Sequence, residues 1–292
     1  MRREPVPAAA AQRLGIPTVA VYQTDVPGYS RVYRVGGGER LAWRWIRRIH
    51  SRAARTLAPS TSTAAELAAR GIPRVWLWRR GVDTRLFDPA RRHEGVRRAL
   101  APRGELLVGY VGRLAPEKRV ELLADTARLA GVRVVVVGDG PTGPSLRRAL
   151  PTAAFVGARH GTQLATLFAS LDIFVHTGPL ETFGQAVQEA LASGVPVVAP
   201  AAGGPLDLVD SGRTGYLVPP GDGASIADAV AGLAADPELR QSFGLAARDS
   251  VVGNTWESIG DELIAHYGAG TGRRAIQAGR RPPTPAQPVT VS

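Results

Sequence analysis

Short apolar runs alternate with amphipathic segments through the middle of the chain. The runs are apolar throughout, as in parallel strands buried on both faces, and they lie at 106–112, 132–140, 154–157, 172–177 and 195–200. Segments with apolar residues at helical spacing separate them, at 116–130, 143–150, 161–169 and 184–194. This alternation predicts a doubly wound parallel α/β domain, followed by further helices at 223–234, 236–252 and 255–267.

The first 85 residues contain a shorter form of the same pattern. PTVAVYQT (17–24) and VWLW (75–78) are typical of strands, and TSTAAELAARG (61–71) is typical of a helix. No glycine-rich turn between a strand and a helix opens this segment, so the pattern starts in the middle of an α/β domain. We therefore expect two α/β domains, of which the N-terminal one is incomplete.

Composition marks the expected domain boundaries. The stretch before residue 105 is charged and contains proline, which suits a linker, and the C-terminal end is rich in Gly, Pro and Arg without a period, which predicts a disordered tail. The expected organisation is an N-terminal domain at 1–85, a linker at 86–104, a larger domain at 105–253, a helix at 254–268 and a tail at 269–292.

The 292-residue chain carries a net charge of +11 and no cysteine. The lack of cysteine excludes disulfide and thiolate chemistry and fits a cytoplasmic protein. The sequence shows no apolar run long enough to span a membrane and no secretory signal. The positive charge favours an anionic partner, although a base-composition bias toward Arg explains it equally well. The acidic and histidine residues have no metal-ligand spacing, so we expect no metal site.

Three glycine-containing segments follow predicted strands. They are GRLAPEK (112–118), GDGP (138–141) and HTGPLETFG (176–184). Because ligands of parallel α/β sheets lie beyond the carboxyl ends of the strands, all three are expected to face one ligand. Their candidate glycines are Gly112, Gly138, Gly140 and Gly184. Taken alone, GDG is explained at least as well by a tight turn between strand and helix.

The basic residues of these segments and the predicted start of a helix at Gly184 favour a phosphorylated ligand. Arg113 and Lys118 would add two positive charges, and Lys118 is the only lysine among 36 basic residues. Gly184 begins a helix, whose N–H groups and dipole attract phosphate. The stretch ETFGQAVQE adds two carboxylates eight residues apart, Glu181 and Glu189, which can accept hydrogen bonds from sugar or ribose hydroxyls. A solvated Glu189 is the alternative, and its apolar neighbours argue against it.

These motifs together resemble a known family. Glu-x7-Glu after a strand, G-R-x4-K upstream and GVPVVAPAAGGP downstream resemble the retaining glycosyltransferases of family four, which have the GT-B fold of two Rossmann-like domains. YQTDVPGY (22–29) and GVDTRLFDP (81–89) look like the actinobacterial GDP-mannose-dependent α-mannosyltransferases of glycolipid assembly. The resemblance implies transfer of a hexose, mannose from GDP-mannose, to a lipid-linked or glycolipid acceptor.

The resemblance also implies a role for each matched residue. Arg113 and Lys118 would hold the donor diphosphate where other enzymes use a metal, so no cofactor is expected. Glu189 would bind the donor ribose. Glu181 would contact hydroxyls of the transferred sugar, and Asp25 would contact the acceptor or the sugar from the N-terminal domain; these two are the candidate catalytic residues. The other implied substrate-binding residues are Gly112, Gly138, Gly140, Phe183, Gly184 and Gln185, with the turn 155–161 against the base.

Two features depart from the family pattern. Many members have His before the Thr-Asp pair, where this chain has Gln23, which cannot act as a general base. Relatives also supply a first strand and a glycine-rich loop before the position where this chain begins, so an N-terminally short form is expected. An inactive nucleotide-sugar-binding fragment and a transferase that uses a UDP-sugar remain the alternatives.

A basic, Trp-containing segment at 39–55 is typical of an amphipathic helix. Leu41, Trp45, Ile49 and Ala53 form an apolar stripe at i+4 spacing, with arginines elsewhere. Such a helix suits an anionic membrane surface, and a peripheral position on the inner face of the plasma membrane would agree with a lipid acceptor. Packing of the stripe on the N-terminal sheet is the alternative. Nucleic acid is not expected as a partner, since the sequence has no signature of a nucleic-acid-binding fold.

Overall fold

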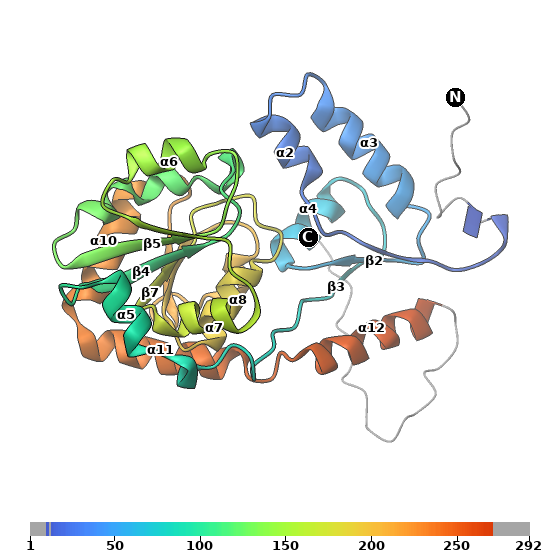
Figure 1. Ribbon diagram of the computed structural model, residues 1–292. Coiled ribbons are helices and arrows are strands. Elements are labelled where there is room, and N and C mark those ends of the chain that lie inside the picture. Colours follow the sequence, from blue (N-terminus) through green and yellow to red (C-terminus); the bar gives the residue numbers. More distant parts are fainter. Residues whose placement is uncertain (1–9, 12, 271–292) are drawn as a thin grey trace. The chain divides into compact units, whose positions relative to one another are not determined.

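The computed structural model describes residues 10, 11 and 13–270 of the chain (Figure 1). The chain divides into two compact units. Unit 2 is continuous, from Val82 to Thr255, whereas unit 1 combines the residues up to Gly81 with those from Trp256 onward. Among the described residues, no helix is long and apolar enough to cross a membrane.

Unit 2 is built on a six-stranded parallel sheet in the order β6-β5-β4-β7-β8-β9. Its strands are β4 (Leu106–Val111), β5 (Val132–Val137), β6 (Ala154–Gly157), β7 (Ile173–Val175), β8 (Val197–Pro200) and β9 (Gly215–Val218). The order reverses between β4 and β7, which is the switch point of a doubly wound sheet. Five of these strands lie within the predicted apolar runs, because valine-rich runs buried on both faces form central parallel strands.

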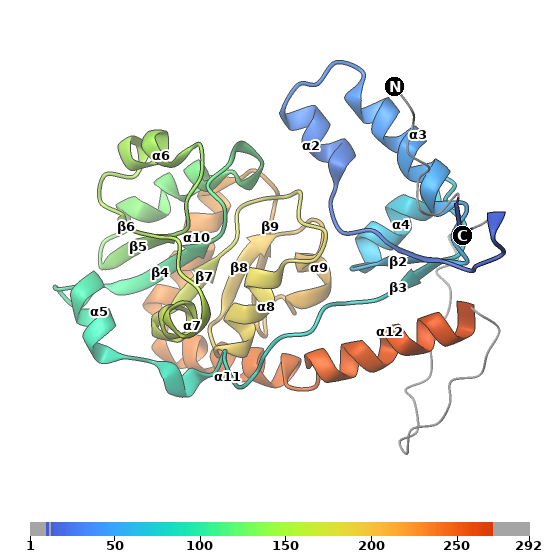
Figure 2. The ribbon, with the colours of Figure 1, turned by 45° about the vertical axis from the view of Figure 1, so that its right-hand side comes forward.

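Helices cover both faces of this sheet, and Figure 2 shows α7 and α8 on one face with α6 and α10 on the other. The helices of unit 2 are α5 (Glu94–Leu100), α6 (Gly143–Ala149), α7 (Gly161–Ser170), α8 (Gln185–Ala192), α9 (Pro205–Leu208), α10 (Gly223–Ala235) and α11 (Pro237–Val251). Side chains cap two of them: Asp222 accepts from the N–H of Ser225, and Asp236 accepts from the N–H of Leu239. Such caps satisfy N–H groups that have no partner within the helix.

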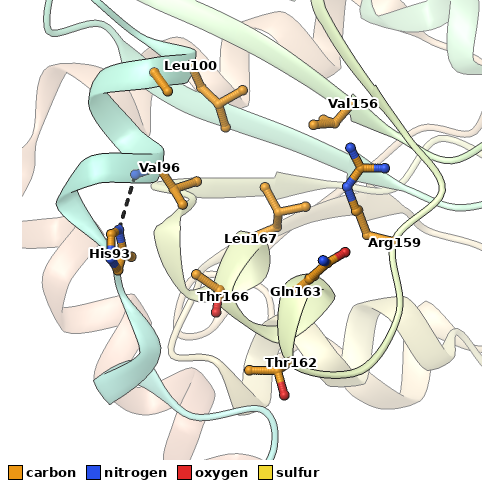
Figure 3. Close-up of a pocket in the computed structure, with 10 residues that line it drawn as sticks. His93, Val96, Leu100, Val156, Arg159, Thr162, Gln163, Thr166 and Leu167 are labelled. Atoms are coloured by element: carbon orange, nitrogen blue, oxygen red, sulfur yellow. Dashed lines mark hydrogen bonds between the residues drawn. The ribbon is translucent and has the colours of Figure 1, made fainter.

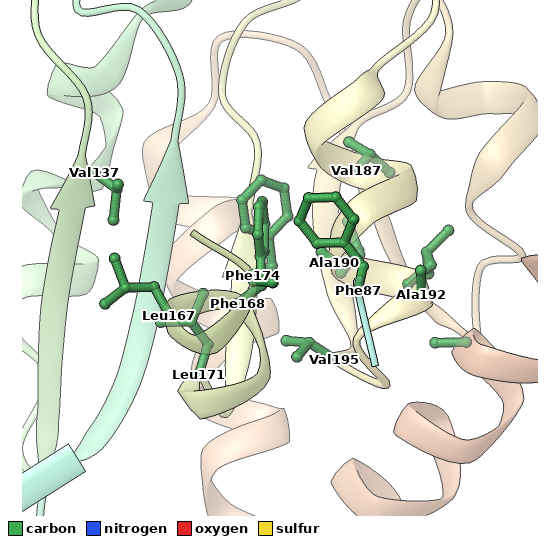
Figure 4. Close-up of a cluster of buried hydrophobic side chains, with 14 of the residues drawn as sticks. Phe87, Val137, Leu167, Phe168, Leu171, Phe174, Val187, Ala190, Ala192 and Val195 are labelled. Carbon is green, nitrogen blue, oxygen red and sulfur yellow. The ribbon is translucent and has the colours of Figure 1, made fainter. Parts of the chain in front are cut away.

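Three aromatic rings fill the centre of the core between the sheet, α7 and α8 (Figure 4). Phe168 of α7 lies 5.7 Å from Phe87 and 5.5 Å from Phe174 of β7, measured between ring centroids. Both pairs have tilted or edge-on geometry, which adds to the stabilisation from burying their area. This packing fixes β7, and with it the segment that follows β7 at the switch point.

Unit 1 contains a three-stranded parallel sheet in the order β1-β2-β3. The strands are β1 (Val19–Val21), β2 (Arg55–Ala58) and β3 (Val75–Leu77). The helices are α2 (Val26–Val32), α3 (Gly38–His50), α4 (Thr61–Ala69) and α12 (Trp256–Gly270). The C-terminal helix α12 is joined to the sheet segment by Trp78, whose indole N–H donates to the carbonyl of Ile259 over 3.0 Å.

One helix of unit 1 is shorter than the sequence predicts. Residues 39–55 do not form a single helix, because α3 ends at His50 and Arg55 begins β2. Helix α4 begins at Thr61, as predicted, after the N-cap Ser60, which accepts from the N–H of Thr63. The amphipathic pattern of 39–55 therefore extends across a boundary that is set by pairing in the sheet.

The alternative that the predicted stripe packs on the N-terminal sheet is wrong for Leu41 and Trp45. The helix packs on unit 1 through Trp43, Ile46 and His50, which are buried. Leu41 and Trp45 are 62% and 57% exposed instead. Two apolar stripes share this helix, and the sheet can bury only the one that its strands face.

A second correction concerns residues 116–130, where an α-helix is predicted. The structure has three short 3-10 segments there: η2 (Pro116–Lys118), η3 (Val120–Ala124) and η4 (Thr126–Arg128). Arg119 separates the first two with a left-handed backbone, φ 52°. The carbonyl of Lys118 accepts from the hydroxyl of Thr177, so a contact outside the segment replaces a helical hydrogen bond.

The charged segment 86–104 belongs to unit 2, where it forms η1 (Pro89–Arg91) and α5. Arg92 and Arg97 lie 3.0 and 2.9 Å from the buried carboxylate of Asp172. This carboxylate also accepts from the backbone N–H of Leu107 over 2.8 Å. The expected tail at 269–292 falls outside the described residues from position 271 onward.

Candidate active site

The switch point of unit 2 brings two of the predicted segments together. β4 and β7 are neighbours in the sheet, although β5 and β6 lie between them in the sequence. The chain that leaves β4 carries Arg113 and Lys118, and the chain that leaves β7 carries Glu181. In sheets of this order, ligands bind in the crevice beyond these strand ends.

Lys118 and Glu181 form an ion pair at this point. The ammonium nitrogen Nζ of Lys118 donates to Oε2 of Glu181 over 2.6 Å. The hydroxyl of Thr177 donates to the carbonyl of Lys118 over 2.6 Å, which ties η2 to the chain after β7. A Cβ added to Gly178 would lie 3.2 Å from the Cα of Lys118, so the two segments pack backbone against backbone. Residues 63 positions apart in the sequence are therefore in direct contact.

The ion pair decides the ionisation of Glu181. Burial is the largest single influence and opposes ionisation, but the charge and hydrogen bond of Lys118, together with smaller contributions, outweigh it and lower the pKa of Glu181. His176 and a hydrogen bond from the backbone of Gly184 act in the same direction as Lys118. Glu181 is therefore a carboxylate at neutral pH, and it can accept hydrogen bonds from ligand hydroxyls.

The start of α8 places the second carboxylate of the Glu-x7-Glu motif. Gly184 is the N-cap of α8 and has a left-handed backbone, φ 99°, which glycine adopts without strain. Phe183 is buried. Gln185, the first residue of α8, forms a hydrogen bond with Glu189, which lies one turn further along the helix. Burial raises the pKa of Glu189 to about 7, with the Gln185 hydrogen bond opposing, so the two carboxylates differ in protonation near neutral pH.

Gly138 and Gly140 let two loops of the site touch through their backbones. A Cβ on Gly138 would lie 1.9 Å from the carbonyl oxygen of Gly112, and a Cβ on Gly140 would lie 2.2 Å from that of Leu114. The N–H of Leu114 also donates to the carbonyl of Asp139 over 3.0 Å. These contacts supply a packing reason for both glycines, and their predicted contact with substrate stays a prediction.

Asp139 connects this loop to the turn 155–161, which is predicted to lie against the base. Its carboxylate accepts from the N–H of Ala158 over 3.0 Å. The guanidinium of Arg159 turns back and donates to the carbonyl of Ala158 over 2.8 Å. Arg113, on the chain after β4, is exposed.

A cavity of about 490 Å³ lies beside this turn, between α5 and α7. Figure 3 shows Val96 and Leu100 of α5 around the same space as Leu167 of α7 and Val156 of β6. Arg159 lies at its edge. The walls are mainly apolar, so the diphosphate of a nucleotide is expected at the Lys118–Glu181 pair and not in this cavity.

Asp25 belongs to unit 1, whereas the other predicted site residues belong to unit 2. It lies four residues after the end of β1 and is the N-cap of α2, where its carboxylate accepts from the N–H of Gly28 over 2.8 Å. Burial, followed by the charge of Asp25, raises the pKa of Glu66. Asp25 thus has a local structural role, and its contact with acceptor or sugar stays a prediction.

Comparison of the sequence with known proteins identifies the family. Residues 105–236 match the family described as "Glycosyl transferases group 1", and residues 3–86 match "Glycosyltransferase Family 4". A GDP-mannose-dependent alpha-mannosyltransferase of Mycobacterium tuberculosis is 54% identical over 270 residues, which cover 92% of this chain and 71% of that protein. The chain belongs to the group 1 glycosyltransferases. A protein of the same description from Mycolicibacterium smegmatis is 52% identical to this glycosyltransferase, with the same coverage.

Solved structures share the fold of this glycosyltransferase. The Anabaena protein HepE, in complex with UDP and glucose, has a TM-score of 0.77 at 23% identity, and the match covers 90% of this chain and 74% of HepE. Sucrose-phosphate synthase from Thermosynechococcus elongatus has a TM-score of 0.80 at 24% identity, with 91% and 71% covered. These likenesses confirm the predicted GT-B fold with two parallel sheets.

Two residues of the candidate site lie in the predicted ligand-facing segment 176–184, but the sequence motifs assign neither of them a role. His176 and Thr177 directly follow β7 and are buried, at 3% and 1% exposure. Thr177 holds the backbone of Lys118, and Nε2 of His176 lies 3.7 Å from Oε2 of Glu181. Polar residues directly after a fully apolar strand are the signal that could have found them, because this is where the sheet meets its ligand.

Proposed function

We propose that the glycosyltransferase transfers mannose from GDP-mannose, with retention of the anomeric configuration, to a lipid-linked or glycolipid acceptor. The observation that carries the donor site is the Lys118–Glu181 ion pair beyond the strand ends at the switch point. It supplies one cation for a diphosphate and one carboxylate for sugar hydroxyls within a single contact. The 54% identity with a GDP-mannose-dependent alpha-mannosyltransferase supports the choice of donor.

The proposed chemistry breaks the bond between the anomeric carbon of mannose and the diphosphate. Negative charge develops on the leaving GDP, and Arg113 and Lys118 stabilise it electrostatically, without a metal. Glu181 binds hydroxyls of the mannose, and Glu189 accepts from the ribose. The leaving phosphate takes the proton of the acceptor hydroxyl, on the same face of the sugar where the new bond forms.

Helix α3 supports the proposal of a lipid acceptor. Leu41 and Trp45 are one turn apart and exposed, and Arg44 and Arg48 on the same helix are exposed as well. An exposed Trp and Leu beside arginines suits the interface of an anionic membrane, where the rings enter the headgroup region and the guanidinium groups meet phosphate. We therefore propose that the enzyme works from the cytoplasm as a peripheral protein on the inner face of the membrane.

Calorimetry with the purified chain tests the donor. GDP-mannose is expected to bind at least tenfold more tightly than UDP-glucose, a difference of about 1.4 kcal/mol. Labelled GDP-mannose is then incubated with a lipid extract, and transfer of an α-mannosyl group to the lipid fraction is expected. Preference for UDP-glucose would indicate a UDP-sugar transferase, donor binding without transfer would indicate an inactive binding fragment, and a chain that binds no nucleotide sugar would refute the proposal.

A further inference from the structure

His176 is a buried side chain within the candidate site that the proposed chemistry does not use. It directly follows β7 at the switch point, and only 3% of its surface is exposed. Among the described residues, neither ring nitrogen has a partner at ordinary hydrogen-bond geometry, and the backbone of Gly178 acts on the ring only from outside that geometry. Buried polar groups are nearly always paired, because leaving one unpaired costs free energy, so this ring requires an explanation.

The ring faces the oxygen that Lys118 holds. Nε2 of His176 lies 3.7 Å from Oε2 of Glu181, and Nζ of Lys118 lies 2.6 Å from that same oxygen. A separation of 3.7 Å is too long for a hydrogen bond, and a shift of about 0.8 Å would make one. His176 is therefore close enough to donate to this oxygen after a small movement, if Lys118 leaves it.

His176 can act only as a neutral donor there. Burial, together with the charge of Lys118, lowers the pKa of His176 to about 4, although the charge of Glu181 and the backbone of Gly178 act in the opposite direction. At neutral pH the imidazole carries one N–H, which either ring nitrogen can hold. A carboxylate oxygen near Nε2 favours the tautomer with the proton on Nε2.

Binding of the nucleotide sugar changes the contacts that the ammonium group of Lys118 can make. A diphosphate competes with Glu181 for the single ammonium group, and the ammonium has three N–H donors on a flexible stem. Once Lys118 turns toward phosphate, Oε2 of Glu181 loses its 2.6 Å partner in a mostly buried place. The backbone of Gly184 would remain as a donor to this carboxylate. Loss of the Lys118 hydrogen bond is still costly in a mostly buried place, unless another N–H replaces the lost one.

We propose that His176 is a positioning residue, which donates a hydrogen bond from Nε2 to Glu181 when Lys118 turns to the donor diphosphate. This replacement of one hydrogen-bond donor by another keeps the Glu181 carboxylate oriented toward the hydroxyls of the transferred sugar. The inference rests on the proposed function, because it needs a donor with both a diphosphate and a sugar. It assigns His176 an effect on the sugar part of the donor alone.

Three substitutions separate this role from simple packing. The amide nitrogen of His176→Gln reaches the position of Nε2, whereas that of His176→Asn reaches only the position of Nδ1, and His176→Leu has no donor. Calorimetry gives the affinity for GDP and for GDP-mannose, and a transfer assay gives kcat and KM. We expect the Asn and Leu variants to bind GDP within about twofold of wild type but to lose roughly 10- to 100-fold in kcat/KM for GDP-mannose.

The Gln variant provides the rescue, with kcat/KM expected within about fivefold of wild type. His50→Leu is the matched control, since it also removes a buried histidine but lies in unit 1, and it should leave the ratio of GDP to GDP-mannose affinity unchanged. The proposal is overturned if Gln rescues no better than Leu, or if all three variants weaken GDP and GDP-mannose equally. A wild-type chain that binds no GDP-mannose would instead refute the proposed function, before any variant is compared.

Discussion

The ammonium of Lys118 lies 2.6 Å from the carboxylate of Glu181, so the two groups predicted to hold opposite parts of the donor bind each other. Their charges are balanced before any ligand arrives, which lets both groups remain charged although they are mostly buried. A donor that brings a diphosphate to Lys118 and hydroxyls to Glu181 would replace one favourable contact with two. The pair therefore makes the site selective for ligands that carry both groups.

Replacing Lys118 with Arg should remove most transfer activity while the protein folds normally. The Lys118 side chain is 16% exposed, and its Nζ already lies 2.6 Å from Oε2 of Glu181, so the larger planar guanidinium does not fit without movement. Arg also binds a carboxylate through two N–H groups and would leave Glu181 less readily. We expect kcat/KM to fall roughly 10- to 100-fold.

Steady-state kinetics and thermal unfolding of Lys118→Arg are the measurements. Arg119→Lys is the control, since it makes the reverse exchange at the next residue, where the side chain is 44% exposed and pairs with Glu121. This control should keep wild-type kinetics. Full activity in Lys118→Arg would contradict the argument that this position requires a compact ammonium group.

The fold of unit 2 could be predicted from the sequence because its strands are buried on both faces and stay apolar from end to end. The segment 116–130 was predicted wrongly, since its helical spacing is real but its backbone is fixed by Thr177 and by the left-handed Arg119. In α3 the spacing fits two stripes, and only the sheet decides that Ile46 is buried and Trp45 exposed. Tertiary contacts decide both the backbone of 116–130 and the buried face of α3, and such contacts cannot be read from a local sequence pattern.

The candidate site, like the fold, could be predicted only in part from the sequence. Glu181 and Lys118 are predicted as site residues because charged residues between a strand and the next helix lie where α/β sheets bind their ligands. Their direct contact joins positions 63 residues apart, and only the order of the strands creates it. His176 was missed because a lone histidine after an apolar strand has no motif, and its significance depends on its distance from Glu181.

Glu189 should make the stability of the protein depend on pH. Burial raises its pKa to about 7 in the folded chain, above the usual value of 4.5. Between these two values the folded state binds more protons than the unfolded state, so this group's stabilisation is full below pH 4.5 and is lost as pH rises through 7. The difference in unfolding free energy between wild type and Glu189→Gln should shift by about 1–3 kcal/mol against wild type from pH 4.5 to pH 8.

Denaturant unfolding at several pH values measures this difference. Glu238→Gln is the control, because Glu238 is exposed on α11, and its difference from wild type should change little with pH. A curve for Glu189→Gln parallel to that of wild type would show that this carboxyl ionises alike in both states.

Gly138→Ala should destabilise unit 2. The added Cβ would lie 1.9 Å from the carbonyl oxygen of Gly112, which is backbone and cannot swing aside as a side chain does. We expect a loss of about 2–4 kcal/mol in the free energy of unfolding. Gly232→Ala is the matched control, since it has no atom within 4 Å of the added Cβ and lies within α10, where Ala gains about 0.5–1 kcal/mol over Gly. Equal unfolding midpoints for the two variants would contradict the backbone packing at Gly138.

Vesicle binding should depend on the exposed stripe of α3. Leu41 and Trp45 are 62% and 57% exposed beside Arg44 and Arg48, whereas Trp256 on α12 is 48% exposed. We expect the chain to sediment with phosphatidylglycerol vesicles and to bind phosphatidylcholine vesicles much more weakly, because each arginine near an anionic surface contributes about 1 kcal/mol. The double variant Arg44→Gln, Arg48→Gln should then lose roughly 30-fold in affinity for the anionic vesicles.

Comparing Trp45→Ser with Trp256→Ser separates the contribution of the exposed indole to vesicle binding from that of the arginines. Both variants remove one exposed indole, but only Trp45 lies on the arginine-bearing helix α3. If α3 inserts its ring into the interface, Trp45→Ser weakens binding about tenfold and remains weaker at 0.5 M salt, where the arginine contribution is screened. Equal losses from both variants would mean that exposed indoles bind without regard to position, and unchanged binding for Trp45→Ser would place the membrane contact elsewhere on the chain.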